Sequence, residues 1–344
     1  MGVQISEIIP KKEITLDILK GKTIVVDGMN ALYQFLTTIR QADGTPLMDR
    51  NGEITSHLSG MFYRNVNLLL EGIDLIYVFD GKPPELKEEE LAERRQRKEE
   101  AKEKYLEAKE KGDLESMRKY ASQSTKVDEK IIKETKELLE AMGIPVVDSA
   151  SEGEAEAAHI VLSNLAWASA SQDFDSLLYG VPRLIRNLTL SRKRRTSSGS
   201  VVDTKIELIE FQKVIEILQI DREQLICLGI IVGTDYNPGG IRGLGQKRAL
   251  EIVRKYKYPV LIFEYLEKSG KFEIDFDWKE IFSHFKNFRG ITTPDKLKKK
   301  KADFEKLKNL LVQRDFSEER INDYIEKLKQ LEEQKKQVSL KDFF

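Results

Sequence analysis

The sequence IVVD at residues 24–27 determines which class of fold the chain can adopt, and LIYVFD at residues 75–80 repeats its pattern. Each is a short run of β-branched, aliphatic or aromatic residues that ends in a carboxylate. Such a run is typical of a strand that is covered on both faces. Further runs of this kind stand at 145–148, 166–170 and 183–186. The sequence therefore predicts a sheet inside the protein, with acidic residues where strands end.

Segments with helical periodicity lie between these strands. Apolar residues recur at helical spacing over 55–70, 127–142 and 152–165. Strands that alternate with helices predict an α/β fold with a mostly parallel central sheet flanked by helices. Ligands of such sheets bind beyond the carboxyl ends of the strands. The functional site is therefore expected at that edge.

Composition excludes several classes of protein. Of the 344 residues, 40% are hydrophobic and 33% are charged, which is typical of a globular protein. The single cysteine, Cys227, excludes a disulfide framework and a thiolate zinc site, and it fits a reducing compartment. No apolar run approaches the ~18 residues needed to span a bilayer. There is no leader of the secretory type, so we expect no membrane association.

The net charge of −1 conceals a segregation of charge. Basic blocks stand at 192–195 and 298–301, whereas aspartates follow the predicted strands. An acidic pocket flanked by basic surface suits an enzyme that holds cations and phosphates together. Either basic block alone is equally compatible with a solvated loop.

Three local patterns of acidic residues carry the candidate chemistry. Asp27 and Asp80 end predicted strands, SEGE at 151–154 opens a helix, and DFD at 173–175 is expected to meet Asp235. Each pattern has an ordinary alternative, because SEGE is also a helix capping box and single aspartates often cap helices or stabilise turns. Together they are harder to explain, since carboxylates ~4 Å apart repel by ~4 kcal/mol per pair at an effective dielectric constant near 20. Such a cluster requires cations, or some members must stay protonated.

The available side chains favour magnesium or manganese as the cation. The histidines are scattered at 57, 159 and 284, so soft and borderline metals lack ligands. Oxygen-only ligands suit Mg²⁺ and Mn²⁺, which keep water molecules and bind phosphate. Two such ions ~4 Å apart stabilise the attacking and leaving oxygens in phosphodiester hydrolysis. The sequence therefore predicts a nuclease.

The chain resembles the flap endonucleases, and their archaeal branch most of all. The resemblance runs in order over about residues 1–256 and returns at FSEER, 316–320. It is carried by ALYQFL (31–36), TSHLSG (55–60), YVFDGKPP (77–84), SEGEA (151–155) and GTDYNPG (233–239). It implies a PIN-like 5′ nuclease fold and a structure-specific enzyme that cleaves branched DNA near the base of a 5′ flap. It also implies 5′-3′ exonuclease activity, with roles in Okazaki fragment maturation and DNA repair.

The resemblance implies two Mg²⁺ ions per chain, for which Mn²⁺ would substitute. The implied ligands are Asp27, Asp80, Glu152 and Glu154 for the first ion, and Asp173, Asp175 and Asp235 for the second. Replacing Asp173 or Asp235 with asparagine is expected to raise stability without magnesium, because like-charge repulsion is relieved.

Residues 87–119 are almost entirely Glu, Lys, Arg and Ala. Strong helix formers predict a helix, but no apolar stripe indicates what it packs on. Either it is a solvated helix held by ion pairs four residues apart, or it is an arm over the active site. The resemblance favours the arm, as the helical arch and cap at about 82–126 through which the flap passes. Lys87 and Arg94, seven residues apart, match the residues that act on the scissile phosphate.

Other candidate DNA contacts lie outside the arch. A helix–two-turn–helix motif is expected at about 222–256, where a glycine-rich turn and a helix N-terminus suit a phosphate, although a plain helical hairpin would have the same pattern. Its candidate contacts are Gly243, Gly245, Lys247 and Arg248. Tyr33 matches an aromatic that stacks on a nucleobase, with Arg40 and Arg64 as lesser candidates. The segments 192–202 and 275–293 depart from the family's pattern.

The last residues, QVSLKDFF at 337–344, fit the spacing of a sliding-clamp binding peptide. Gln337 is followed by Leu340 and then by Phe343 and Phe344. Two exposed aromatics at the end of a charged chain require a partner, and the resemblance implies the clamp PCNA. The alternative is a frayed terminus without a partner.

The expected organisation is a 5′ nuclease domain over 1–325 and a C-terminal tail over 326–344. The resemblance implies a monomer in the cytoplasm, associated with the nucleoid. Two other functions stay open: a related exonuclease or gap endonuclease on the same scaffold, and a catalytically silent adaptor for branched DNA or clamp. An adaptor has no use for clustered carboxylates, which argues against the second.

Overall fold

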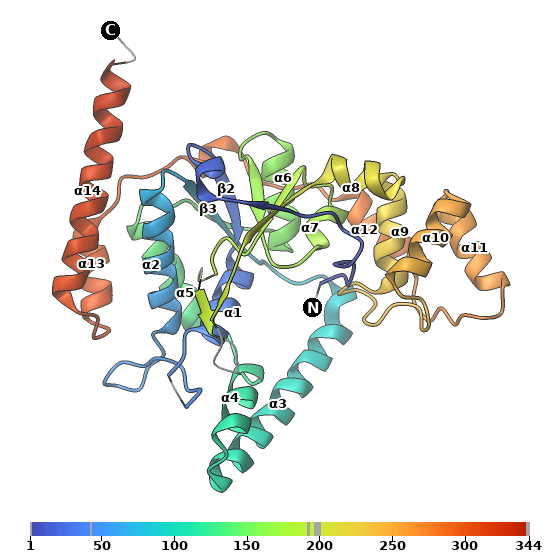
Figure 1. The fold of residues 1–344 in the computed structure, drawn as a ribbon, viewed down its shortest axis with the longest axis horizontal. Coiled ribbons are helices and arrows are strands. Elements are labelled where there is room, and N and C mark those ends of the chain that lie inside the picture. Colours follow the sequence, from blue (N-terminus) through green and yellow to red (C-terminus); the bar gives the residue numbers. More distant parts are fainter. Residues whose placement is uncertain (1, 42, 191–192, 196–200, 342–344) are drawn as a thin grey trace.

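A computed structural model describes residues 2–41, 43–190, 193–195 and 201–341. Within these residues, seven strands form one sheet in the order β1-β9-β6-β5-β2-β3-β4, and β7 and β8 form a separate hairpin (Figure 1). The strands are β1 (Lys12–Ile14), β2 (Thr23–Asp27), β3 (Asp74–Phe79), β4 (Val146–Asp148), β5 (Ala168–Ala170), β6 (Arg183–Arg186), β7 (Lys193–Arg195), β8 (Val201–Asp203) and β9 (Ile206–Glu210).

The central part of the sheet is parallel. β2 pairs in parallel with both β3 and β5, β3 with β4, and β5 with β6. Only the outer strands β9 and β1 run antiparallel to their neighbours. The predicted α/β class with a mostly parallel sheet is therefore confirmed, and the carboxyl ends of β2 to β6 share one edge.

The residues of strand β2 are apolar on both faces because each face of the strand packs in a hydrophobic core. Val25 belongs to one hydrophobic core and Ile24 and Val26 belong to another, because successive side chains of a strand point to opposite faces. None of the three is more than 2% exposed.

Helices cover both faces of the sheet (Figure 1). The cores place α1, α2, α5, α13 and α14 on one face and α6, α7, α9 and α12 on the other. The helices are α1 (Gly28–Thr38), α2 (Ser56–Leu70), α3 (Glu88–Lys111), α4 (Leu114–Gln123), α5 (Glu129–Ala141), α6 (Gly153–Leu162), α7 (Asp175–Leu178), α8 (Phe211–Leu218), α9 (Arg222–Val232), α10 (Gln246–Tyr256), α11 (Pro259–Lys268), α12 (Trp278–Asn287), α13 (Phe304–Val312) and α14 (Glu318–Lys341). Short 3-10 helices occur at η1 (Leu16–Leu19), η2 (Glu85–Lys87) and η3 (Pro294–Leu297).

The charged segment forms α3 and α4, which project from the body as a helical hairpin (Figure 1). The apolar stripe that the sequence did not reveal consists of small residues. Ala101 and Ala108, seven residues apart on α3, are buried, as are Met117 and Ala121 on α4, and the two helices pack on each other. The segment is therefore a packed hairpin and not a single solvated helix.

The boundary expected after residue 325 falls inside α14, which continues to Lys341. Leu328 is buried in the same core as Ile325, so packing extends beyond that position. Phe343 and Phe344 lie outside the described residues. Among the helices of the described residues, none combines the length and the apolar character that a membrane span requires.

Candidate functional site

The ends of β2 and β3 deliver the first two carboxylates. Asp27 closes β2 and caps α1, because its Oδ1 accepts a hydrogen bond from the Asn30 N–H at 2.9 Å. Asp80 follows β3 and accepts from the Gly153 N–H at 2.7 Å, at the start of α6. A Cβ at Gly153 would lie 2.9 Å from Asp80 Oδ1, so this close approach favours glycine.

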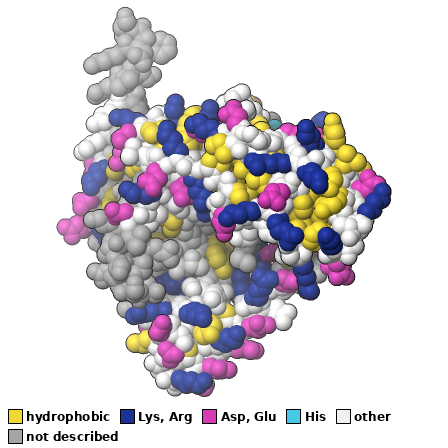
Figure 2. Space-filling view, turned by 45° about the vertical axis from the view of Figure 1, so that its right-hand side comes forward, with side chains coloured by type: hydrophobic (Ala, Val, Ile, Leu, Met, Phe, Trp, Pro, Cys, Tyr) yellow, Lys and Arg dark blue, Asp and Glu magenta, His cyan; other side chains and the backbone are white. Residues whose placement is uncertain are grey.

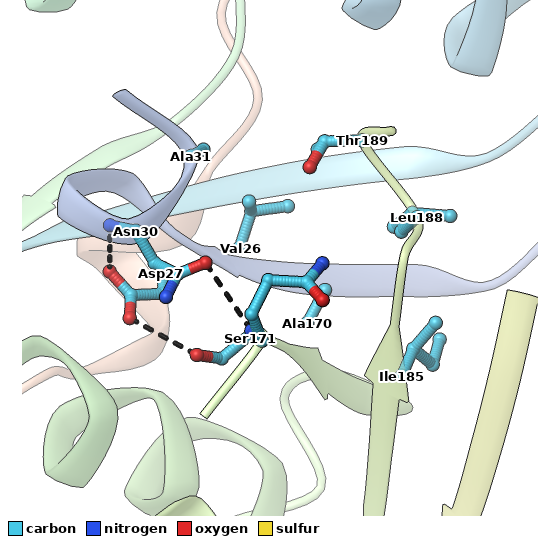
Figure 3. A pocket seen from close by; sticks show the side chains of 10 residues that line it. Val26, Asp27, Asn30, Ala31, Ala170, Ser171, Ile185, Leu188 and Thr189 are labelled. Carbon is cyan, nitrogen blue, oxygen red and sulfur yellow. Dashed lines mark hydrogen bonds between the residues drawn. The ribbon is translucent and has the colours of Figure 1, made fainter. Parts of the chain in front are cut away.

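Two polar side chains link the carboxylates of different elements. Ser171 Oγ lies 3.3 Å from Asp27 Oδ2 and 2.9 Å from Glu154 Oε1. Asn30 Nδ2 donates to Asp173 Oδ2 at 3.0 Å. Figure 3 shows Asp27, Asn30 and Ser171 joined by hydrogen bonds beside a small pocket. Strand β2, helix α6 and the loop after β5 therefore meet at one point.

The N-terminal segment holds the second group of carboxylates, which the sequence did not indicate. The Gly2 N–H lies 3.3 Å from Asp173 Oδ1, and the Val3 N–H donates to Asp175 Oδ1 at 2.6 Å. A Cβ at Gly2 would lie 2.7 Å from Asp173 Cβ. The start of the chain is thus part of the site.

Two cations from the base of the arch face the remaining carboxylates. Lys87 Nζ forms an ion pair with Glu152 and lies 3.1 Å from Asp235 Oδ2. Arg94 Nη2 lies 3.0 Å from the same Asp235 oxygen, and Arg94 also pairs with Glu90. The two basic residues singled out by sequence are therefore brought to the carboxylate cluster.

The carboxylates of the cluster fall into two sets, which differ in whether neighbouring positive charge offsets the effect of burial on their pKa values. Burial raises the pKa of Asp27 to about 7, with a further contribution from Asp80, and burial and Asp235 raise the pKa of Asp175 to about 8. Burial also raises the pKa values of Asp80 and Glu154. In these four carboxyl groups, neighbouring positive charge does not offset the effect of burial, so the protonated form is more favoured than in a free carboxyl group.

The other set is compensated by the protein itself. Burial opposes the charged form of Glu152, but hydrogen bonding from His284 and the charge of Lys87 outweigh it and hold its pKa well below the usual range. The charges of Lys87 and Arg94 likewise outweigh the effect of burial and lower the pKa of Asp235. This compensation argues against the expected gain in stability from Asp235→Asn, since the change removes a partner from two cations.

The ordinary alternatives account for only part of the acidic cluster, since Asp27 caps α1 but the other two patterns are not explained in this way. No side chain caps α6, whose N-cap is Glu152, so the SEGE pattern is not a capping box. Asp235 is engaged by Lys87 and Arg94. Within the part of the chain that is described, no three His, Cys, Asp or Glu side chains are spaced as a complete direct metal shell. A cation that keeps several waters is compatible with such wider spacing.

Aromatic groups surround Glu152, and sequence reasoning missed them. The hydroxyls of Tyr179 and Tyr236 donate to Glu152 Oε2. His284 Nε2, on α12, lies 2.6 Å from the Tyr236 hydroxyl and 3.1 Å from the Tyr179 hydroxyl. Tyr236 stands in the quoted GTDYNPG block, but nothing in the sequence marked His284.

The candidate DNA contacts outside the arch differ in their accessibility. Tyr33 on α1 is 38% exposed, and Lys98 Nζ lies 5.2 Å from its ring centroid. Arg40 donates to the Leu36 and Gly44 carbonyls and to Thr125, which weakens its case as a phosphate contact. Arg64 is half-buried on α2.

The turn between α9 and α10 has the geometry expected of a phosphate-binding turn. Gly243 has φ of +82°, and a Cβ at Gly243 or Gly245 would meet open space. Gly245 begins α10, and the adjacent Lys247 and Arg248 are exposed. Backbone N–H groups at this helix N-terminus are accessible to an anion.

Known proteins resemble the chain over its whole length. The model of the XPG N-terminal domain matches residues 1–101, and that of the XPG I-region matches residues 143–235. Flap endonuclease 1 of Pyrococcus furiosus is 51% identical over 100% of this chain and 99% of its own length. The structure of flap endonuclease-1 from Methanococcus jannaschii is 42% identical, with a TM-score of 0.74 over 97% of this chain and 100% of that one. The Rad2 catalytic core in complex with DNA substrate shares the fold at 21% identity, with a TM-score of 0.68 over 92% and 96% of the two chains.

The raised pKa of Asp175 predicts how stability depends on pH in a chelating buffer. The folded protein holds a proton on Asp175 between about pH 4 and pH 8, whereas the unfolded chain has released it. The contribution of this group to the free energy of unfolding therefore falls as pH rises through that interval. Asp175→Asn should lose this pH dependence. At pH 8 its free energy of unfolding should exceed that of the parent by at least about 1.4 kcal/mol, the equivalent of one pKa unit.

Urea unfolding of both proteins at pH 4.5, 6 and 8 measures the difference. Asp203→Asn, which changes an exposed aspartate, serves as the control and should track the parent. If Asp175→Asn and parent differed equally at all three pH values, Asp175 would not be a protonated buried carboxyl.

Proposed function

The chain belongs to the flap endonuclease 1 family of XPG-type 5′ nucleases, and from this premise we propose that its carboxylate cluster binds two Mg²⁺ ions and cleaves DNA near the base of a 5′ flap. As a member of this family it is a nuclease that hydrolyses phosphodiester bonds in DNA replication and repair. The observation that carries the proposed site is the convergence of Asp27, Glu154 and Asp173 through shared hydrogen bonds. The 5′-3′ exonuclease activity and the role in Okazaki fragment maturation belong to the same proposal.

The donor set supports magnesium, with manganese as a substitute. All seven candidates are carboxylates, the oxygen ligands that these cations prefer. We assign Asp27, Asp80, Glu152 and Glu154 to one ion and Asp173, Asp175 and Asp235 to the other. The raised pKa values of Asp27 and Asp175 support this proposal, because a neighbouring cation favours the ionised carboxylate. When bound, the ions would supply charge neutralisation and an activated water for phosphodiester hydrolysis.

Lys87 and Arg94 are the proposed catalytic cations of the chain itself. Both side chains reach the carboxylates, so a phosphate held at the cluster lies within their reach. They can offset negative charge that develops on the scissile phosphate. Lys87 is 17% exposed and Arg94 is 40% exposed, so Lys87 is the more strongly desolvated of the two.

We assign the rest of the DNA path to the elements that project from the body of the protein. The hairpin of α3 and α4 acts as the arch for the 5′ flap, and the turn with Gly243, Gly245, Lys247 and Arg248 contacts duplex phosphates. The exposed Tyr33 stacks on a base next to the cut. The proposed division keeps a nuclease domain over 1–325 and a terminal segment over 326–344 with the clamp peptide at 337–344, although the core of the domain continues to Leu328 in α14.

The proposed partner of the terminal peptide is the sliding clamp PCNA, bound by a monomeric enzyme. Gln337 and Leu340 lie within α14 as described, while the two phenylalanines lie outside the described residues.

Asp173→Asn tests the metal site. Cleavage of a double-flap substrate in saturating Mg²⁺ should fall at least about a hundredfold, the upper range for disturbing a metal centre. Flap-DNA binding should stay within several-fold, because arch and helical turn hold the DNA. Asp148→Asn is the matched control, since Asp148 also ends a strand but is 66% exposed and pairs with Lys136.

Parent and variants are assayed on flap, nicked, bubble and single-stranded DNA. Near-normal turnover of Asp173→Asn would contradict the two-ion assignment. A parent that prefers nicked or gapped DNA to flaps would instead favour the exonuclease or gap endonuclease alternative.

Lys87→Ala should lower the single-turnover rate by about 10²–10³-fold with little change in DNA affinity, because a transition-state contact is lost. Arg94→Ala should have a smaller effect, since Arg95 and Arg97 are close in sequence. Rapid-quench kinetics at saturating enzyme measures the rate, and Lys109→Ala, at the exposed far end of α3, is the control. A variant whose only defect is weaker binding would show that the side chain has no electrostatic role in chemistry.

Phe343→Ala combined with Phe344→Ala tests the terminal peptide. Each phenylalanine contributes about 1.5–3 kcal/mol of apolar burial before ordering costs, so clamp binding by calorimetry and clamp stimulation should both disappear. Cleavage of a free flap should be unchanged, and Asp342→Ala should behave as the parent. Clamp binding as tight as that of the parent would exclude the docking role, whereas loss of basal cleavage would place the tail on the nuclease body.

A further inference from the structure

His284 joins two tyrosine hydroxyls and one carboxylate into a single hydrogen-bonded group. Its Nε2 lies 2.6 Å from the Tyr236 hydroxyl, 3.1 Å from the Tyr179 hydroxyl and 3.4 Å from Glu152 Oε2. The group is enclosed by aromatic rings. The ring centroids of Tyr236 and His284 are 4.5 Å apart, and Phe285 packs 5.0 Å from Tyr179. In such a weakly polar enclosure, hydrogen bonds are strong and an unpaired polar atom is costly.

The number of hydrogens that each group can donate determines which atom is the donor in each of these hydrogen bonds. Glu152 also pairs with Lys87, so its carboxylate is charged and only accepts. Each tyrosine has one hydroxyl proton, and both tyrosines direct it to Glu152 Oε2. The tyrosine oxygens can then only accept from His284. Its Nε2 must therefore carry a hydrogen, which the two hydroxyl oxygens share.

We propose that His284 is a positioning residue that, through Tyr236 and Tyr179, holds the Glu152 carboxylate with Oε1 turned to Lys87. This inference rests on the proposed function, in which Glu152 and Lys87 belong to the reactive site. Oε2 is occupied by the two hydroxyls, so the carboxylate cannot rotate without breaking both hydrogen bonds. Lys87 Nζ also lies 5.7 Å from the Tyr236 ring centroid, so the same tyrosine limits where the lysine side chain can lie.

His284 comes from a helix beyond the residues that the two family models match, although full-length relatives cover it. His284 lies on α12, whereas the two family models match residues 1–101 and 143–235. It also lies within 275–293, one of the segments where the chain departs from the family's pattern. The histidine thus adds a donor to a carboxylate that lies 132 positions away in the sequence.

The tautomer of His284 is the direct structural test. The chain has only three histidines, so ¹⁵N-histidine labelling resolves each ring, and His284→Gln identifies the signals of interest. In the metal-free protein, His284 should carry its hydrogen on Nε2. A hydrogen on Nδ1 alone would overturn the proposed hydrogen-bond directions, whatever the activity of the enzyme.

Single-turnover cleavage of a flap substrate tests the consequence. His284→Phe should lower the rate about tenfold or more and raise the Mg²⁺ concentration for half-maximal rate, as loss of support around a metal ligand does. Affinity for flap DNA should change less than about twofold. His284→Gln, which keeps an N–H donor at similar reach, should recover most of the rate, and Ser283→Ala on the exposed side of α12 should match the parent.

A double-mutant cycle separates positioning from general damage to the fold. Tyr236→Phe should cause a comparable loss, and the pair with His284→Phe should lose little more than the worse single variant, because both changes break one path. A parent-like rate for His284→Phe, equal losses in His284→Phe and His284→Gln, or additive losses would each overturn the proposal. A parent that cleaves no flap in Mg²⁺ would contradict the proposed function, whereas the tautomer measurement would still decide on the hydrogen-bonded group.

Discussion

Mutual repulsion among carboxylates gathered at one sheet edge is the constraint on which the rest of the site depends. Two ionised carboxylates ~4 Å apart would oppose folding by ~4 kcal/mol at an effective dielectric constant near 20, and burial of the charges adds to that opposition. The protein compensates some members with its own cations, as Lys87 does for Glu152 and Asp235. It leaves others, such as Asp27 and Asp175, with raised pKa values. This uneven compensation is what prepares the site for added cations.

The compensating groups come from segments that are far apart in the sequence, and they tie the molecule together at the site. Backbone N–H groups of residues 2–3 reach Asp173 and Asp175, while Arg94 at the base of the arch reaches Asp235 in the loop that leads to α10. The hairpin of α3 and α4 and the glycine-rich turn before α10 therefore both lead away from the carboxylates. Under the proposed function, a phosphate that enters the cluster competes for Arg94 and so acts on the hairpin directly.

The parts of the fold that could be predicted are those with a strong local signal. The apolar runs ending at Asp27 and Asp80 became β2 and β3 because both of their faces are covered. The antiparallel strands β1 and β9 were missed, since these short segments carry no comparable run of apolar residues. The alanines that pack α3 on α4 were also missed, because a stripe of small residues barely alters the polarity of a highly charged helix.

The sequence by itself determined the class of fold, the acidic residue types of the site and the cations that they favour, because these follow from local periodicity and ligand chemistry. Only the tertiary structure decided how each carboxylate is charged and held. Asp175 and Asp235 look equivalent in sequence, yet their pKa values shift in opposite directions because Lys87 and Arg94 reach one of them. His284 approaches Glu152 only because α12 packs on α9, since the two residues are 132 positions apart in the sequence. Electrostatic and hydrogen-bonding energies depend on distance in space, which separation along the chain does not specify.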